Sequence, residues 1–185
     1  MKLIGIIIIT LLTYFIGQRS EVKCVIQPYT GINSIKLYKS TLENVIQEFD
    51  EEKIKRKWER GIDLQFIGQF VNSIKYNDLG LTFSDLGHDR HIFGKNGIVR
   101  MITIDSCCNC KTEEGIGLGS SFKDVKGAFG LPLFPRDTRD KNYEPTMVIE
   151  RHGKEEYLYV SYHNLIMKFS STNTDEAKIV RIQMY

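Results

Sequence analysis

The chain has 185 residues, of which 25 are lysine or arginine, 23 are aspartate or glutamate and 42% are hydrophobic. These proportions are those of a globular protein, and they exclude a disordered or collagen-like chain. The formal net charge of +2 gives no strong basic field of the kind that nucleic-acid-binding domains carry. We therefore expect no nucleic-acid partner.

The first 20 residues have the features of an export signal. Residues 3–17 are an almost unbroken apolar run behind Met1 and Lys2. A membrane-spanning helix needs about 20 apolar residues, whereas a basic start with about 7 to 15 apolar residues is typical of a secretory signal. We expect residues 1–20 to be a signal peptide and the protein to be periplasmic or extracellular. The alternative is an uncleaved leader that anchors the chain, which would be its one contact with a membrane.

Four cysteines follow the leader, at Cys24, Cys107, Cys108 and Cys110. Disulfides persist outside the cytosol, and four cysteines permit two disulfides in any of three pairings. We therefore expect disulfide bonds, with no bound metal and no cofactor. The alternative is a zinc site on Cys107, Cys108 and Cys110, although zinc ligands usually come as spaced C-x2-C pairs and no histidine stands near this cluster.

Beyond the leader, the sequence predicts two homologous units, residues 25–106 and 111–185. Residues 40–49 match residues 120–129, and each segment opens with hydroxyl side chains that can cap a helix. Each then carries apolar residues at helical spacing, which predicts one buried stripe per helix. These residues are Leu42, Val45, Ile46 and Phe49 in the first segment, and Phe122, Val125, Ala128 and Phe129 in the second.

Strands are predicted in the second half of each unit. Residues 76–84 match 162–170, residues 98–102 match 179–183, and all of them alternate apolar with polar positions. Residues 62–66 and 147–149 supply one further strand each. We therefore predict an α+β fold in which each unit is an opening helix followed by three to four antiparallel strands, the two units packing as one body.

One segment has no counterpart in the second unit. Residues 50–60 mix acidic and basic side chains, with Ile54 and Trp58 one helical turn apart. We expect a solvated helix that packs Ile54 and Trp58 onto the body. The alternative is an exposed Trp58 that anchors a partner, since tryptophan is enriched among binding hot spots.

Residues 118–125 (LGSSFKDV) and 129–132 (FGLP) resemble the motif at the start of a helix in the superfamily of small outer-membrane lipoproteins and β-lactamase-inhibitor-like proteins. The two-unit arrangement is similar to the two repeats of the inhibitor. Members of the superfamily are exported, lack catalytic residues and bind proteins, either as envelope assembly factors or as enzyme inhibitors. The resemblance therefore implies a protein partner and no enzymatic activity.

The residues themselves predict no catalytic site. His88 and His91 form an H-x-x-H, but they fall in a predicted loop where this spacing fixes no shared face. The glycine run at residues 115–121 lacks the Gly-Lys-Ser/Thr ending of a phosphate-binding loop. We expect a protein that is not an enzyme. The alternative is a metal-dependent hydrolase that uses the cysteine cluster and the H-x-x-H.

A binding surface is predicted on the sheet. Arg100 and Arg181 stand at matched places in the two units and face away from the apolar stripes, near Tyr157 and Tyr159 by the same alternation. Arginine with tyrosine is the composition of protein-binding surfaces. The alternative is a solvated sheet face, which long charged side chains commonly cover. These four residues, with Trp58 as a further anchor, are the candidate partner-binding residues. The predicted function is a non-catalytic protein-binding or inhibitor-like module of the bacterial envelope; the alternative is a membrane-tethered assembly or structural factor.

Overall fold

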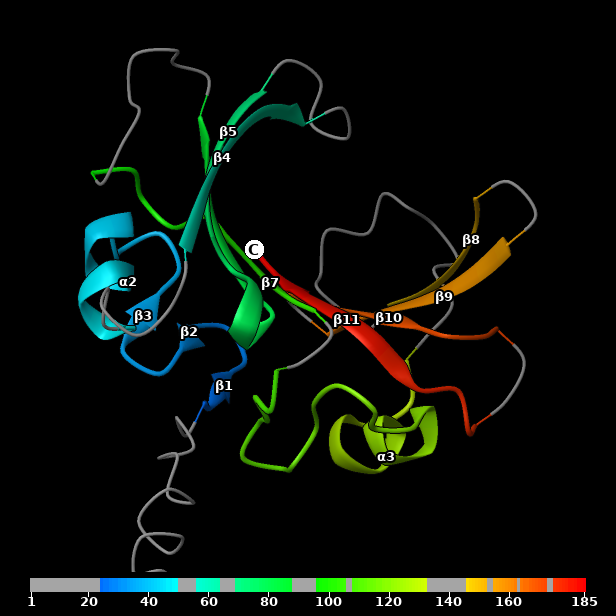
Figure 1. Ribbon diagram of the computed structural model, residues 1–185. Coiled ribbons are helices and arrows are strands. Elements are labelled where there is room, and N and C mark those ends of the chain that lie inside the picture. The colour runs from blue at the N-terminus through cyan, green and yellow to red at the C-terminus, as the bar shows by residue number, and fades with distance from the viewer. Residues whose placement is uncertain are drawn as a thin grey trace, which may run out of the picture.

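The computed structural model describes residues 24–49, 56–63, 69–87, 96–105, 108–132, 146–152, 155–162, 164–172 and 175–185 (Figure 1). The predicted leader therefore lies outside the described residues. None of the described helices is long and apolar enough to cross a membrane.

An eight-stranded antiparallel sheet forms the body of the protein, in the order β4-β5-β6-β7-β11-β10-β9-β8. From one edge to the other, its strands are β4 (Arg56–Asp63), β5 (Gln69–Tyr76), β6 (Leu81–Gly87), β7 (Met101–Ile104), β11 (Ile179–Met184), β10 (Leu165–Phe169), β9 (Glu155–Tyr162) and β8 (Thr146–His152). The chain builds the sheet outside-in, first from β4 to β7 and then from β8 to β11. The strand pair β7/β11 joins the two halves, with Ile104 opposite Ile182 and Ile102 opposite Met184.

Smaller elements precede or connect these strands. A three-stranded sheet opens the described chain, made of β1 (Ile26–Gln27), β2 (Gly31–Ile32) and β3 (Ile35–Lys36). Helix α2 (Leu42–Glu48) follows it, a 3-10 turn η1 (Asn77–Leu79) links β5 to β6, and helix α3 (Phe122–Phe129) precedes β8.

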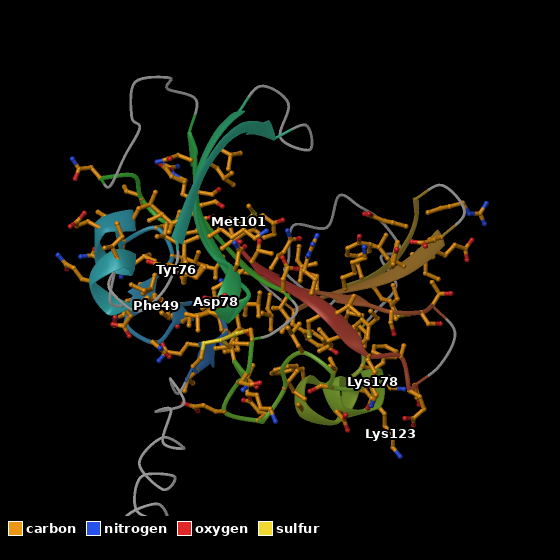
Figure 2. The ribbon with its side chains drawn as sticks, viewed as in Figure 1. Phe49, Tyr76, Asp78, Met101, Lys123 and Lys178 are labelled. Atoms are coloured by element: carbon orange, nitrogen blue, oxygen red, sulfur yellow. A yellow bond between two sulfur atoms is a disulfide. The ribbon has the colours of Figure 1, made fainter. Side chains whose placement is uncertain are left out.

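The core lies between the helices and one face of the large sheet. Alternate strand residues are fully buried, as in the Leu165, Met167 and Phe169 series of β10. Helix α2 reaches this face just beyond its last turn, where the ring of Phe49 lies 5.4 Å from that of Phe83, and Figure 2 shows Phe49 beside Tyr76. Helix α3 packs its Phe122 ring 5.3 Å from that of Phe169. Both helices therefore cover the same face.

The two predicted helices are confirmed, with their capping residues. Thr41 and Ser121 each accept a hydrogen bond from the backbone N–H three residues on, and the side-chain oxygen at that position accepts one from the backbone N–H of the cap residue. Such reciprocal capping boxes satisfy N–H groups that have no partner inside the helix. Gly130 ends α3 at φ 86°, a backbone conformation that favours glycine.

The predicted α+β fold class is wrong. The described chain is mostly β, with a three-stranded and an eight-stranded sheet and only two short helices, of seven and eight residues. The first half does not open with a helix either, because β1 to β3 precede α2. The helical periodicity predicts the two helices correctly. Most of the buried core residues nevertheless lie in strands, so the helices do not form a layer comparable to the sheet. The internal repeat stays a prediction.

The charged segment at residues 50–60 is not the expected helix where the structure describes it. Residues from Arg56 onward form β4, which pairs with β5 over its full length, Trp58 standing opposite Ile74. Its mixed charges suit a helix surface as well as a strand, so local sequence does not decide between them. Pairing with β5 supplies hydrogen-bond partners for the backbone N–H and C=O groups of β4. This pairing with the next strand overrides the helical pattern.

We predict that Ile182→Ala lowers the free energy of unfolding by about 2 to 5 kcal/mol, the usual range for a truncated buried isoleucine. Ile182 is 0% exposed and stands opposite Ile104 where the two halves of the sheet meet. Urea unfolding provides the measurement, with Val180→Ala as the matched control in the same strand. A loss no larger than that of the control would show that the β7/β11 contact contributes little.

A second prediction concerns Tyr162, whose hydroxyl donates a hydrogen bond to the Gly130 carbonyl at 2.6 Å and so ties the end of α3 to β9. Burial raises the pKa of Tyr162 from 10.0 to about 12, so folding favours the neutral phenol. The contribution of the neutral Tyr162 phenol to the free energy of unfolding is complete below the unfolded pKa of about 10, and it is lost as the pH rises toward the folded pKa. Between these pH values, we expect the free energy of unfolding, measured with urea, to fall less with rising pH in Tyr162→Phe than in wild type. Parallel curves for the two proteins would contradict this assignment.

Candidate functional site

A row of large side chains crosses four strands on the face of the sheet that points away from the core. Strand register places Val148 opposite Tyr159, Tyr159 opposite Lys168, and Lys168 opposite Arg181. Their strand neighbours, such as Leu158, Met167 and Ile182, are buried on the helix side. The row therefore projects from the opposite face. We call Tyr157, Tyr159, Lys168 and Arg181 the Lys–Arg–Tyr cluster.

Lys168 lies over the rings of both tyrosines. Its Nζ is 3.4 Å from the Tyr157 ring centroid and 5.8 Å from that of Tyr159, within the range of cation–π attraction. Two cations directly opposite each other on neighbouring strands normally destabilise a sheet. The aromatic rings offset part of that cost on the Lys168 side. The sheet therefore tolerates two adjacent positive charges here.

Arg181 is held by a carboxylate from the other half of the molecule. Its Nε donates to Asp105 Oδ1 at 2.7 Å, and the two side chains are 47% and 31% exposed. Asp105 directly follows β7, so this ion pair crosses the junction between the two halves of the sheet. An ion pair this exposed contributes little stability, but it fixes the direction of the guanidinium group.

Two hollows meet at Arg181. One, of about 390 Å³, is lined by Lys75, Asn77, Gly80, Thr82, Asp105, Val180 and Arg181. The other, of about 370 Å³, is lined by Val148, Glu150, Tyr159, Ser161, Ile166, Lys168, Arg181, Gln183 and Tyr185. Arg181 lines both hollows, and its partner Asp105 lines the first. Each hollow combines charged with hydroxyl or amide side chains, and the apolar side chains are Val180 in the first and Val148 and Ile166 in the second. Each hollow can therefore receive a side chain from another protein.

Both tyrosines of the cluster are neutral at ordinary pH. Burial raises the pKa of Tyr159, and Glu150 raises it further while Arg181 opposes the shift. The hydrogen bond that the Tyr157 hydroxyl donates to Glu155 is the main cause that raises the pKa of Tyr157. Each residue therefore presents a phenol and an aromatic ring, a combination common at protein interfaces.

Arg100 does not join this cluster. Its Nε donates to Asp85 Oδ1 at 3.2 Å, and Asp85 lies on the same side of β6 as the buried Leu81 and Phe83. Burial raises the pKa of Asp85, although Arg100 partly opposes this. The two arginines therefore do not share a face, contrary to the prediction. The prediction aligns Arg100 with Arg181 by sequence similarity. In the structure β7 and β11 are offset by one residue relative to that alignment, and a shift of one residue moves a side chain to the other face of a sheet.

Trp58 is also separated from the cluster. It belongs to β4, at the edge of the sheet opposite to β8, and three strands lie between β4 and β11. The orientation of its side chain lies outside what the structure describes. Of the five predicted partner-binding residues, the structure thus brings together Arg181, Tyr157 and Tyr159.

The structure adds two residues that the sequence reasoning missed. Lys168 could have been found, because Leu165, Met167 and Phe169 form the apolar stripe of β10 and leave Ile166 and Lys168 on the other face. Asp105 could not have been predicted from a local pattern, because its partner Arg181 is 76 residues away along the chain.

The three cysteines that the structure describes lie together, Cys24 at the start of the described chain and Cys108 and Cys110 in the segment after β7. Cys24 forms a disulfide with Cys110, with their Cα atoms 4.5 Å apart, and the Cys108 sulfur contacts that of Cys110. All three sulfur atoms lie within 4.8 Å of one another, close enough to hold one metal ion as an alternative to the bond. Cys107, His88 and His91 lie outside the described residues, so the hydrolase alternative is not tested by the structure.

No protein-family model matches the chain, and neither does any curated protein or solved structure. The resemblance to the lipoprotein and β-lactamase-inhibitor-like superfamily therefore stays a prediction.

We predict that Asp105→Asn lowers the free energy of unfolding by about 0.2 to 1 kcal/mol, because Arg181 loses its ion pair. The difference from wild type should shrink as salt is added, since exposed charges are screened. Asp78→Asn is the matched control, because it removes the same charge from the exposed turn η1 (Figure 2). Equal effects of the two substitutions, measured by urea unfolding at low and high salt, would reject a specific role for the pair.

Proposed function

We propose that the protein is a non-catalytic module that binds an acidic patch of another protein through the Lys–Arg–Tyr cluster. The observation that carries this proposal is the register that sets Lys168 directly opposite Arg181, with Tyr157 and Tyr159 beside them. A position on the polar face of a sheet does not require two adjacent cations for folding. Their presence is therefore better explained by a ligand than by stability.

The charges favour a partner with carboxylates at its surface. Lys168 and Arg181 repel each other in the unbound protein, and an anionic group placed between them would remove that repulsion. The same pair would repel a basic surface, so it would select among partners as well as attract them. Arg181 is oriented by Asp105 at 2.7 Å before any partner arrives, which reduces the ordering cost of binding.

The aromatic and apolar neighbours suit a macromolecular ligand. Tyrosine and arginine are enriched among residues that dominate binding energy, and Val148, at 42% exposure, adds an apolar contact at the end of the same row. The two hollows on either side of Arg181, of about 390 and 370 Å³, offer room for side chains of the partner. A protein surface can use both hollows at once.

We also propose that binding takes place outside the cytosol. Two features support this compartment, namely the short basic start with its apolar run at residues 3–17 and the disulfide between Cys24 and Cys110. If the leader is not cleaved, the same face would be presented by a protein tethered to the membrane.

The test is a charge reversal of the cluster. Wild-type protein is used to isolate a partner from an envelope fraction, the partner is identified by mass spectrometry, and both proteins are then purified for titration calorimetry. We expect the double variant Lys168→Glu, Arg181→Glu to bind at least about 30-fold more weakly, which corresponds to about 2 kcal/mol.

Lys123→Glu, Lys178→Glu is the matched control. Both lysines are exposed, and Figure 2 shows them near α3, on the other side of the sheet. This variant changes the net charge by the same amount, so it corrects for long-range electrostatics. An equal loss in both double variants, or no loss in either, would rule out the Lys–Arg–Tyr cluster as the binding face.

A further inference from the structure

Three cysteines come together where the residues before β1 meet the segment between β7 and α3. Cys110 lies between Cys24, to which it is bonded, and Cys108, whose sulfur contacts its own. Because all three sulfur atoms lie within 4.8 Å of one another, Cys110 can bond to either neighbour without a large movement of the chain. This arrangement offers two disulfides that exclude each other.

Burial separates this group from external thiols. Cys110 is 1% exposed and Cys108 is 9% exposed, so a dissolved thiol has little access to the Cys110 sulfur. Cys24 is half-buried and therefore closer to solvent. Thiol–disulfide exchange depends on access as well as on reactivity, which makes Cys108 the best-placed attacking group among the described residues.

A backbone donor assists Cys108. The Cys110 N–H points at Cys108 Sγ with a nitrogen–sulfur distance of 3.3 Å. A cysteine sulfur can accept such a hydrogen bond, and the thiolate form of a cysteine is the nucleophile in exchange. The donor belongs to the residue under attack, so it also holds Cys108 next to the Cys110 sulfur.

We propose that Cys24, Cys108 and Cys110 form an internal thiol–disulfide exchange site. The Cys108 thiolate attacks the Cys110 sulfur and forms the Cys108–Cys110 bond. The Cys24–Cys110 bond breaks, and Cys24 leaves as a thiolate that takes up the proton lost by Cys108. One disulfide and one thiol are present before and after, so no oxidant or reductant is consumed.

The exchange changes both the cross-link and the location of the thiol. The Cys24–Cys110 bond spans 86 residues, whereas a Cys108–Cys110 bond spans two. A cross-link that closes a long loop stabilises the folded state more, so the first form is the more stable one. In the second form the thiol stands at half-buried Cys24, where it can react with a disulfide or thiol reagent that does not reach Cys108.

Release of Cys24 would leave the start of the chain attached through its backbone. Ile26 donates to the Lys111 carbonyl at 2.9 Å, and Lys111 donates to the Cys24 carbonyl at 3.2 Å. These two hydrogen bonds hold β1 beside residue 111 without the disulfide. Exchange can therefore occur in the folded protein.

The test maps disulfides in the full chain carrying Cys107→Ser, which removes the one cysteine outside the described residues. Thiols are alkylated in acid-quenched samples, and the linkages are identified by peptide mass spectrometry. We expect two populations, Cys24–Cys110 with alkylated Cys108 and Cys108–Cys110 with alkylated Cys24. Their ratio should be the same whichever form is enriched at the start.

Two further variants, each able to form only one of the two disulfides, provide the reference for each linkage. Adding Cys108→Ser should leave the Cys24–Cys110 bond alone and give the highest melting temperature, whereas adding Cys24→Ser should leave only Cys108–Cys110 and a lower one. A single Cys24–Cys110 population in which Cys108 stays reduced would overturn the proposal. So would the wild-type chain with Cys108 bonded to Cys107, or with all cysteines reduced and one zinc ion bound per chain.

Discussion

The structure depends on the pairing of β7 with β11, which, among the described residues, joins two four-stranded halves into a single sheet. Both strands are short, and the buried Ile104 and Ile102 of β7 stand opposite Ile182 and Met184 of β11. Neither half could bury this edge alone, and an unpaired central strand would expose a row of backbone N–H and C=O groups. The junction therefore removes two sheet edges and joins two small cores into one of useful size.

In the part of the chain that the structure describes, helices cover one face of this sheet, and the other face is where we place the binding function. Both helices lie against the same side, so alternation sends every second residue of β9, β10 and β11 to the other side. That side needs only to remain soluble, and many polar residues would meet this requirement. The choice of Lys168 opposite Arg181, which opposes stability, is therefore informative in a way that the buried Met167 and Ile182 are not.

The sequence predicted local features well and long-range relations poorly. The helices were found because Thr41 and Ser121 stand directly before apolar residues at helical spacing, and this information is contained in about ten residues. The alternation of Tyr157, Tyr159 and Arg181 also placed them on the correct face. The predicted face of Arg100 was wrong because it depends on the register between strands, and local sequence does not determine a register to one residue. The predicted fold class was wrong because much of the strand pairing, as in β7 with β11, joins segments that are distant in sequence.

The two proposed sites are independent because the sheet separates them. The short N-terminal sheet lies on the core side, where Ile26 and Ile32 are buried, and it is also held by the hydrogen bond from the Tyr29 N–H to Asn164 Oδ1 at 2.8 Å. Asn164 belongs to the turn between β9 and β10, so this contact joins the N-terminal sheet to the second half. Exchange at Cys110 would loosen residue 24 while leaving this contact and the register of β9 to β11 unchanged. A protein whose cysteines do not exchange would therefore still present Lys168 and Arg181 to a partner, and loss of partner binding would carry no information about the disulfide.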